Sequence, residues 1–428
     1  AISPRLNLRG FYRGMAGSTT LGLLVAAGAV AFAPASWPVV LPFALLWLGA
    51  PALALHASRS PRVARSLALS ESDARDLRLT ARHTWRFFET FVTPADNMLP
   101  PDNFQEDPQP VVAHRTSPTN MGLYLLSTIA ARDFGWAGTL QTVERLETTL
   151  ACMLSLQRHR GHFFNWYDTQ DLRALEPAYV SSVDSGNLAG HLIVLANACE
   201  EWFAMPLAPQ ARQGMQDNLH LARATIDALS ANSERGQQLA ALLDDIAAQL
   251  QGAQALETIS APLKRLTEKA VKLAREIAPG VGEDGLSDLL FWLEALGQSL
   301  AEHARDRQQA DAAVAGLRLR LQALAGTARE MALAMDFAFL LDPERKLLSI
   351  GYGLVDNRLD PNCYDLLASE ARLASLFAIA KGDVSTRHWF RLGRTATPLG
   401  NGSALISWSG SMFEYLMPSL IMRAPSGS

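Results

Sequence analysis

The longest uncharged stretch of the chain lies near its N-terminus, between Arg13 and Arg59, and contains no Asp, Glu, Lys or Arg. Two prolines interrupt this stretch within residues 33–38, and one regular helix cannot accommodate both of them. The pattern therefore predicts two apolar helices, at about 19–33 and 39–55. Each is slightly shorter than the roughly 20 residues that span a bilayer.

Arginines flank this apolar pair on both sides: Arg5, Arg9 and Arg13 before it and Arg59, Arg62 and Arg65 after it. We expect a transmembrane helical hairpin with Trp37 near the far interface, because a hairpin places both flanks on one side of a membrane. The positive-inside rule makes this the cytoplasmic side. One bent span and a buried globular helix are the alternatives, whereas the length of the apolar run disfavours a secretory signal.

Helical periodicity dominates the part of the chain that follows. Apolar faces predict helices at about 70–92, 116–131, 139–157 and 185–203. Ser117-Pro118 is typical of a helix start, with a capping side chain followed by proline in the first turn. Helix pairs joined by aromatic-rich loops, as here, are typical of an α/α barrel.

The segment 206–334 has a different composition, in which Ala, Gln, Leu and charged residues dominate. Its amphipathic spacing predicts a long helical hairpin that is inserted in the barrel or packed beside it. A partner-binding coiled coil is the alternative, although no strict heptad is sustained. The next segment, 337–352, predicts a β-hairpin with its turn at Asp342-Pro343.

The predicted fold class is therefore mainly α. A transmembrane helical hairpin (1–66) precedes an incomplete α/α barrel in two parts (67–205 and 335–428), with the helical insertion (206–334) between them and a small β-hairpin. The chain begins without Met and ends at Ser428, directly after a strongly patterned motif. We therefore expect it to be a piece of a longer polypeptide.

Composition and charge exclude several classes of function. The net charge is −4 and no block of Lys or Arg occurs, which disfavours nucleic acid as a partner. The three cysteines, Cys152, Cys199 and Cys363, are too far apart to suggest a disulfide framework or a zinc site. The histidines lack metal-ligand spacing, and no nucleotide-binding glycine motif occurs. We expect no metal and no cofactor.

Several loops combine aromatic rings with hydrogen-bonding side chains, as a carbohydrate site requires. The ring faces come from Trp166, Tyr167, Trp389, Trp408 and Tyr415. The other candidate substrate-binding residues are His114, Arg115, Asn120, Asn165, Asp168, Asp184, Asn187, Tyr364, Arg391 and Ser409. Asp184 is equally well explained as a helix cap.

Hydrolysis or transfer at a glycosidic bond also needs two carboxylates that flank the bond. The candidates are Asp168, Asp184, Asp360, Asp365, Glu370 and Glu414. We favour Glu370, because an unpaired carboxylate is costly in its apolar helical segment, and Glu414, because a tight loop precedes it. The structural alternatives are a salt bridge from Glu370 to Arg372 and a helix N-terminal role for Glu414.

Five strings of the sequence resemble the cyclic β-1,2-glucan synthases, very large bacterial inner-membrane proteins. They are GHFFNWYDT, EPAYVSSVDSGNLAGHL, YDLLASEARLASLFAIAKGD, HWFRLGR and LISWSGSMFEYLMP, within about 80–200 and 335–423. The resemblance implies a glycoamylase-like α/α barrel that closes a linear β-1,2-glucan chain into a ring by transglycosylation. It also implies a retaining mechanism with Glu370 as the nucleophile.

The family pattern continues into a further acidic motif, so the resemblance places the acid/base partner beyond residue 428. The implied partners are the β-1,2-glucan chain, the lipid bilayer and the remaining domains of the same polypeptide. The implied location is the bacterial inner membrane, with the soluble part facing the cytoplasm. The alternatives are an inverting β-1,2-glucan hydrolase with the same barrel and a non-catalytic, membrane-anchored glucan-binding module.

Overall fold

The computed structural model describes residues 7–57, 69–229, 234–277, 283–308, 311–367, 370–400 and 402–422. These residues form two compact units, one before residue 70 and one from Ser70 to Met422.

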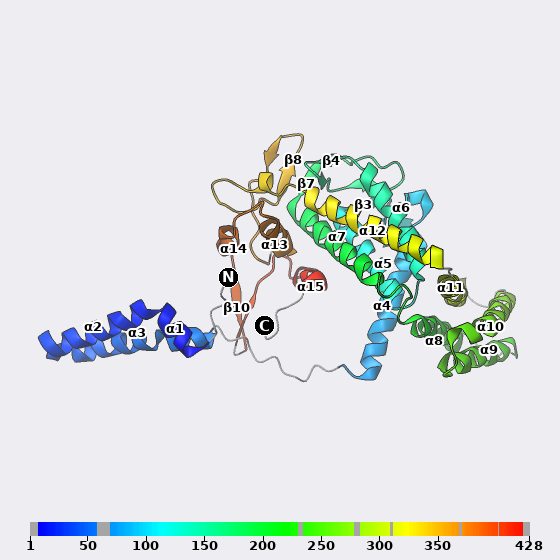
Figure 1. Cartoon of the computed structure of the whole chain (residues 1–428), viewed down its shortest axis with the longest axis horizontal. Helices are drawn as coiled ribbons and strands as arrows, with labels where there is room; N and C mark the ends of the chain where they lie inside the picture. The colour runs from blue at the N-terminus through cyan, green and yellow to red at the C-terminus, as the bar shows by residue number, and fades with distance from the viewer. Residues whose placement is uncertain are drawn as a thin grey trace. The chain divides into compact units, whose positions relative to one another are not determined.

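The first unit is an apolar pair of helices, with a short helix, α1 (Leu8–Gly14), before it. Helices α2 (Ala16–Phe32) and α3 (Trp37–Ala57) lie side by side (Figure 1), and the 3-10 turn η1 (Pro34–Ser36) joins them at the predicted break. Gly22 permits the close contact, since a Cβ atom there would lie 3.1 Å from Leu48 Cγ and 3.3 Å from the Ala44 carbonyl oxygen. Among the described helices, one (Pro34–His56) is long and apolar enough to cross a membrane. The pair α1 and α2, bent by 74° at their junction, passes the same test together.

The second unit consists mainly of helices. They are α4 (Glu71–Phe91), α5 (Pro118–Asp133), α6 (Thr139–Ser155), α7 (Ser182–Trp202), α8 (Ala211–Leu229), α9 (Glu234–Gln251), α10 (Leu256–Ile277), α11 (Glu283–Arg307), α12 (Asp311–Ala334), α13 (Arg372–Lys381), α14 (Arg387–Arg391) and α15 (Met412–Ile421). The helix starts follow from the sequence. Ser70 caps α4 by accepting from the Asp73 N–H, and Ser117 caps α5 in the same way, with Pro118 in its first turn.

In the described residues the strands are short and form five small antiparallel sheets. The two-stranded sheets are β1 (Phe104–Gln105) with β2 (Val111–Val112), β3 (Arg115–Thr116) with β6 (Tyr167–Asp168), β4 (Arg158–His159) with β5 (His162–Phe163), and β10 (Ala396–Leu399) with β11 (Gly402–Leu405). The three-stranded sheet has the order β7 (Tyr179–Ser181), β8 (Gly351–Gly353) and β9 (Arg358–Leu359).

The β-hairpin predicted at 337–352 is only partly correct. The turn at Asp342-Pro343 is present and is closed by a bridge between Leu341 and Leu348. Residues Ala338–Leu340, however, form a 3-10 turn, because Phe337 and Leu340 are fully buried in the core and bend the backbone toward it. The strand that follows, β8, pairs instead with β7 and β9.

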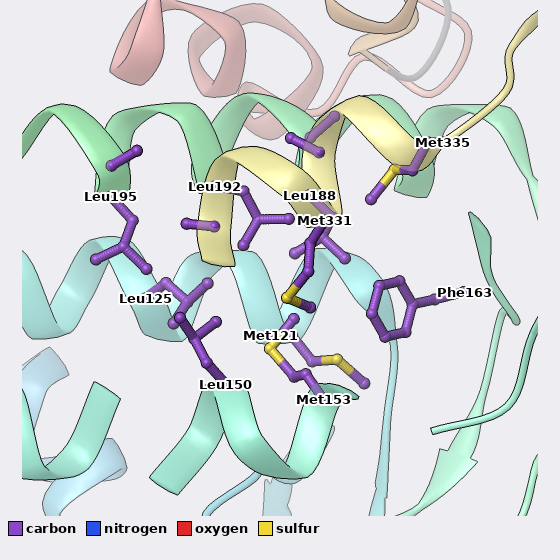
Figure 2. Close-up of a cluster of buried hydrophobic side chains, with 14 of the residues drawn as sticks. Met121, Leu125, Leu150, Met153, Phe163, Leu188, Leu192, Leu195, Met331 and Met335 are labelled. Atoms are coloured by element: carbon purple, nitrogen blue, oxygen red, sulfur yellow. The ribbon is translucent and has the colours of Figure 1, made fainter. Parts of the chain in front are cut away.

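One hydrophobic core lies among α5, α6, α7 and α12 (Figure 2). Its labelled side chains are Met121, Leu125, Leu150, Met153, Phe163, Leu188, Leu192, Leu195, Met331 and Met335. A second core lies within α8 to α11, with Trp292 buried among aliphatic side chains. The predicted insertion at 206–334 is thus divided, since α12 packs on α7 while α8 to α11 have their own core. Helix-on-helix packing with small sheets confirms the mainly α fold class.

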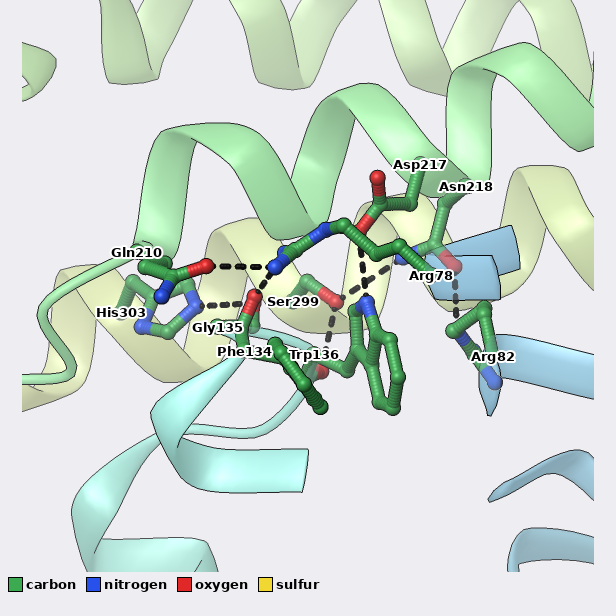
Figure 3. Close-up of polar contacts among 10 residues, drawn as sticks. All are labelled: Arg78, Arg82, Phe134, Gly135, Trp136, Gln210, Asp217, Asn218, Ser299 and His303. Atoms are coloured by element: carbon green, nitrogen blue, oxygen red, sulfur yellow. Dashed lines mark hydrogen bonds and ion pairs between the residues drawn. The ribbon is translucent and has the colours of Figure 1, made fainter. Parts of the chain in front are cut away.

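A buried polar junction, drawn in Figure 3, joins α4 to α8 and to the loop between α5 and α6. Arg78 Nε donates to Asp217 Oδ2 on α8 at 2.7 Å, and Trp136 Nε1 donates to the same oxygen at 2.7 Å. Arg82, which is fully buried, donates to Asn218 Oδ1 at 2.7 Å, and its Cζ lies 5.0 Å from the centroid of the Trp292 ring. Burial raises the pKa of Asp217, while Trp136 and Arg78 oppose this effect.

Loss of the carboxylate at this junction should be costly. In the detergent-solubilised chain, Asp217→Ala is expected to lower the free energy of unfolding by about 3–5 kcal/mol, because Arg78 and the Trp136 indole lose their buried partner. Denaturant unfolding measures the difference. The matched control is Glu294→Ala, which breaks the exposed pair Arg275–Glu294 and should cost less than about 1 kcal/mol. Equal losses for the two variants would contradict the prediction.

Candidate active site

The candidate site is built at the N-terminus of α7, where Ser181 caps the helix and Asp184 lies in the first turn. Thr119 on α5 donates its hydroxyl hydrogen to Asp184 Oδ1. The Asn165 amide donates to Asp184 Oδ2 at 3.1 Å and, in the same orientation, accepts from Trp166 Nε1 at 3.2 Å. Burial raises the pKa of Asp184, whereas the hydrogen bonds from Thr119 and Ser181 oppose that effect.

Asn187, next on the same side of α7, connects Asp184 to Glu370. Its Nδ2 atom donates to Thr119 Oγ1 at 3.1 Å and to Glu370 Oε1 at 3.4 Å. We call the set Asn165, Thr119, Asp184, Asn187 and Glu370 the carboxylate network. It brings together two of the predicted carboxylates and two of the predicted amides, and it adds Thr119, which was not among the predicted site residues.

The backbone at Glu370 differs from the prediction. Glu370 does not lie inside an α-helix: it is in a 3-10 turn that precedes α13 and has a φ of 50°, in the left-handed region that few residues other than glycine adopt. Helix α13 is held tightly against α7, since a Cβ atom on Gly186 would lie 2.4 Å from Ala374 Cα. This contact brings the start of α13, and with it Glu370, to Asn187. Arg372, the predicted salt-bridge partner, donates to the Tyr415 carbonyl oxygen at 2.9 Å.

Aromatic side chains lie near the carboxylate network. Trp166 is partly exposed and is hydrogen-bonded to Asn165, and the Arg115 guanidinium lies 4.7 Å from the centroid of one of its rings. The Tyr364 and Trp408 rings are 5.3 Å apart, and Trp408 is 55% exposed. Burial, followed by the charges of Asp184 and Glu370, raises the pKa of Tyr364. The arrangement offers ring faces to sugars beside two carboxylates.

Asp102 positions two of the predicted residues and was missed in the sequence. Its Oδ2 atom accepts from Arg115 at 2.9 and 3.2 Å, and its Oδ1 atom accepts from Asn120 at 3.2 Å. The residues Pro-Pro-Asp-Asn that contain Asp102 predict an irregular loop, and nothing in this pattern indicates a role in the site.

Three predicted site residues have structural roles instead. Tyr167 is fully buried in the core and donates to the Gln157 carbonyl oxygen at 2.6 Å, so its ring face is not available to a sugar. Asp168 accepts from the backbone N–H groups of Gln170 and Asp171, which forms a local turn. His114 pairs with the buried Asp96 at 2.7 Å.

The C-terminal candidates also make local contacts. Glu414 is buried and accepts from the Ser409 N–H at 3.2 and 3.3 Å, while Ser411 caps α15 by accepting from the Glu414 N–H. This is the helix N-terminal role that the sequence left open. Arg391 is exposed and donates to the Arg345 carbonyl oxygen at 3.1 Å. Among the residues that the structure describes, no group of three or more His, Cys, Asp or Glu could hold a metal ion.

Two buried histidines near the network are held neutral. Burial lowers the pKa of His162 to about 4, and its Nε2 atom donates to the Asp336 carbonyl oxygen at 2.8 Å. Burial also lowers the pKa of His191 to about 4. Neither ring nitrogen of His191 has a partner among the described residues. A Cβ atom on Gly122 would lie 2.1 Å from its Nδ1 atom.

Acid should therefore destabilise the chain between pH 6.5 and 4. In this window the unfolded histidine (pKa about 6.5) binds a proton that the folded one does not. The free energy of unfolding therefore decreases by about 1.4 kcal/mol for each histidine when the pH is lowered by one unit. His191→Met should reduce this slope by about that amount and leave stability at pH 7 little changed. Denaturant unfolding across pH measures it, with the exposed His220→Met as the control. An unchanged slope in His191→Met would refute the assignment.

Comparisons with known proteins bear on this site. No family model matches the chain. It is 45% identical over 404 residues to the "Cyclic beta-(1,2)-glucan synthase NdvB" of Rhizobium meliloti, an alignment that covers 90% of the chain and 14% of that relative. The chain thus spans about 14% of the length of the relative it matches. Two solved structures are also similar at 10% identity and a TM-score of 0.42, both putative glucoamylases. The match to the Bacteroides fragilis protein covers 82% of this chain and 60% of the Bacteroides fragilis chain. The match to the Bacteroides caccae protein covers 80% of this chain and 59% of the Bacteroides caccae chain.

Proposed function

The chain is a relative of the cyclic β-1,2-glucan synthases, as its sequence motifs predicted, and we propose that it carries part of a site that transfers β-1,2-glucan chains. The substrate is a linear β-1,2-glucan, and the product is a ring closed by a new β-1,2 bond. The single observation that carries the proposal is the carboxylate network, in which hydrogen bonds connect the buried Glu370, through Asn187 and Thr119, to Asp184 and on to Asn165 and Trp166. Aromatic faces beside carboxylates are what sugar binding and glycosyl transfer require.

In the proposed retaining mechanism, Glu370 attacks the anomeric carbon and the glycosidic bond to the leaving oxygen breaks. The leaving oxygen takes a proton from a general acid, which we expect in the remaining domains of a longer polypeptide. A hydroxyl at the other end of the same glucan then displaces Glu370 and returns a proton to the acid. One β-1,2 bond is broken and one is formed, and no water is consumed.

The test uses the complete protein that contains this chain. Linear β-1,2-glucan should give cyclic products, and Glu370→Gln should reduce turnover by several orders of magnitude while the fold is retained, because the amide cannot act as a nucleophile. Product analysis by mass spectrometry and circular dichroism measure the two effects. Glu414→Gln is the matched comparison and should reduce turnover far less, since its carboxylate accepts from a backbone N–H.

Each other outcome identifies an alternative. Net hydrolysis with inversion would identify a β-1,2-glucan hydrolase, and binding without turnover would identify a glucan-binding module. Full activity in Glu370→Gln would show that another residue carries the chemistry.

We also propose that α2 and α3 anchor the chain in the bacterial inner membrane, with the site on the cytoplasmic side. The apolar helix Pro34–His56 and the arginines on both flanks support this orientation. Of these arginines, Arg5, Arg59, Arg62 and Arg65 lie outside the described residues.

Cysteines introduced at Asn7 and at Ser60, which also lies outside the described residues, should therefore be protected together from an impermeant thiol reagent in intact cells. Both should react after permeabilisation. The native cysteines interfere little, because burial raises the pKa of Cys152 to about 11 and that of Cys199 to about 12. Labelling of only one introduced site in intact cells would show a single span instead of a hairpin.

A further inference from the structure

The carboxylate network forms a continuous series of hydrogen bonds from Trp166 to Glu370. The Trp166 indole donates to Asn165, and Asn165 donates to Asp184. From the other direction, Asn187 donates to Thr119, and Thr119 donates its one hydroxyl hydrogen to Asp184. The second amide hydrogen of Asn187 goes to Glu370. Asp184 thus accepts from both branches and fixes the orientation of each.

The Asn187 side chain is fully buried, between α5 and the start of α13. Its predicted role in substrate binding stays a prediction. What its amide does contact is Glu370 on one side and Thr119 on the other.

We propose that Asp184, Thr119 and Asn187 are positioning residues that hold Glu370 in its reactive orientation and charge state, and that they connect it to Trp166. This inference rests on the proposed role of Glu370 in glycosyl transfer. A donor held rigidly at Glu370 Oε1 favours the carboxylate over the carboxylic acid. Thr119 keeps that donor in place by accepting the other amide hydrogen, and Asp184 keeps Thr119 in place.

Several acidic or phenolic groups share the surroundings of Tyr364 with Glu370. They are Asp184 on α7, Tyr179 on β7 and Asp360 on the segment that leads to α13. Burial, followed by the charges of Asp360 and Asp184, raises the pKa of Tyr179 to about 12. In such surroundings the amide donor has a large effect on the pH at which Glu370 takes up a proton, because negative charges nearby oppose the ionisation of Glu370.

The first experiment needs no substrate. The difference in unfolding free energy between the wild-type chain and Glu370→Gln is measured from pH 4 to 9, and its midpoint reports the protonation of Glu370. The same difference is then measured in the Asn187→Leu and Thr119→Val backgrounds. The midpoint should rise by about one pH unit in the first background and by about half a unit in the second, because Glu370 loses a fixed donor. An unchanged midpoint in both would overturn the inference.

The second experiment follows the pH dependence of β-1,2-glucan transfer in the complete protein. The acidic limb of the rate should move to higher pH in Thr119→Val and return to its original position in Thr119→Ser, which restores the hydroxyl. Trp166→Phe keeps an aromatic face but removes the indole N–H. It should leave the KM for glucan within about twofold and lower kcat. The control is Thr128→Val, a buried hydroxyl on the same helix that bonds only to the Tyr124 carbonyl oxygen among the described residues and should leave the profile unchanged.

The two experiments separate failure of the inference from failure of the proposed function. A shifted midpoint in a protein that does not transfer β-1,2-glucan would support the positioning role and reject the function. Active glucan transfer with an unshifted pH profile in Thr119→Val and an unchanged kcat in Trp166→Phe would reject the positioning role and keep the function.

Discussion

The close packing of α7 against its neighbours is the constraint on which the rest of the second unit depends. This helix contacts α5, α12, α13 and α15, so nearly every side of it meets another element. Small residues make this possible, because a Cβ atom on Gly186 would collide with the α13 backbone and one on Gly190 would lie 2.5 Å from Ile421 Cδ1. This packing removes most polar side chains near the N-terminus of α7 from water, whereas Asn197, Glu200 and Glu201 near its C-terminus are exposed. Ser185, Asn187 and Asp184 must therefore bond to groups on other elements, which is how the carboxylate network arises.

The junction at Arg78 and Arg82 applies the same principle between α4, α8 and the loop after α5. Both guanidinium groups are removed from water and are compensated by Asp217, Asn218 and the faces of Phe134 and Trp292. The residues come from segments that are far apart in sequence, so the junction forms only when these segments have packed together. Helices α8 to α11 are thus tied to the site-bearing part through polar contacts of defined geometry, as well as through apolar surface.

The sequence predicted features that depend on local chemistry and missed those that depend on tertiary contact. The N-terminal boundaries of α4 and α5 could be predicted from Ser70, Ser117 and Pro118, because helix capping depends on residues within one turn. The left-handed backbone at Glu370 could not be predicted, since it results from packing of α13 on α7. Tyr167 was assigned to the site because aromatic residues in polar loops look alike whether they are exposed or buried. Thr119 and Asp102 became visible only through the partners that they bind.

The core in Figure 2 is unusually rich in methionine, and this affects how the site is supported. Met121, Met153, Met331 and Met335 come from α5, α6 and the region of α12, and all four are buried in the core that also contains Leu188 and Leu192 of α7. The methionine side chain is unbranched and adapts its shape readily, so the helices can shift by small amounts without opening voids. The disadvantage of methionine is that its sulfur can be oxidised. Oxidation of one thioether to a sulfoxide would place a polar oxygen in this core, which makes the support beneath the network vulnerable to oxidative damage.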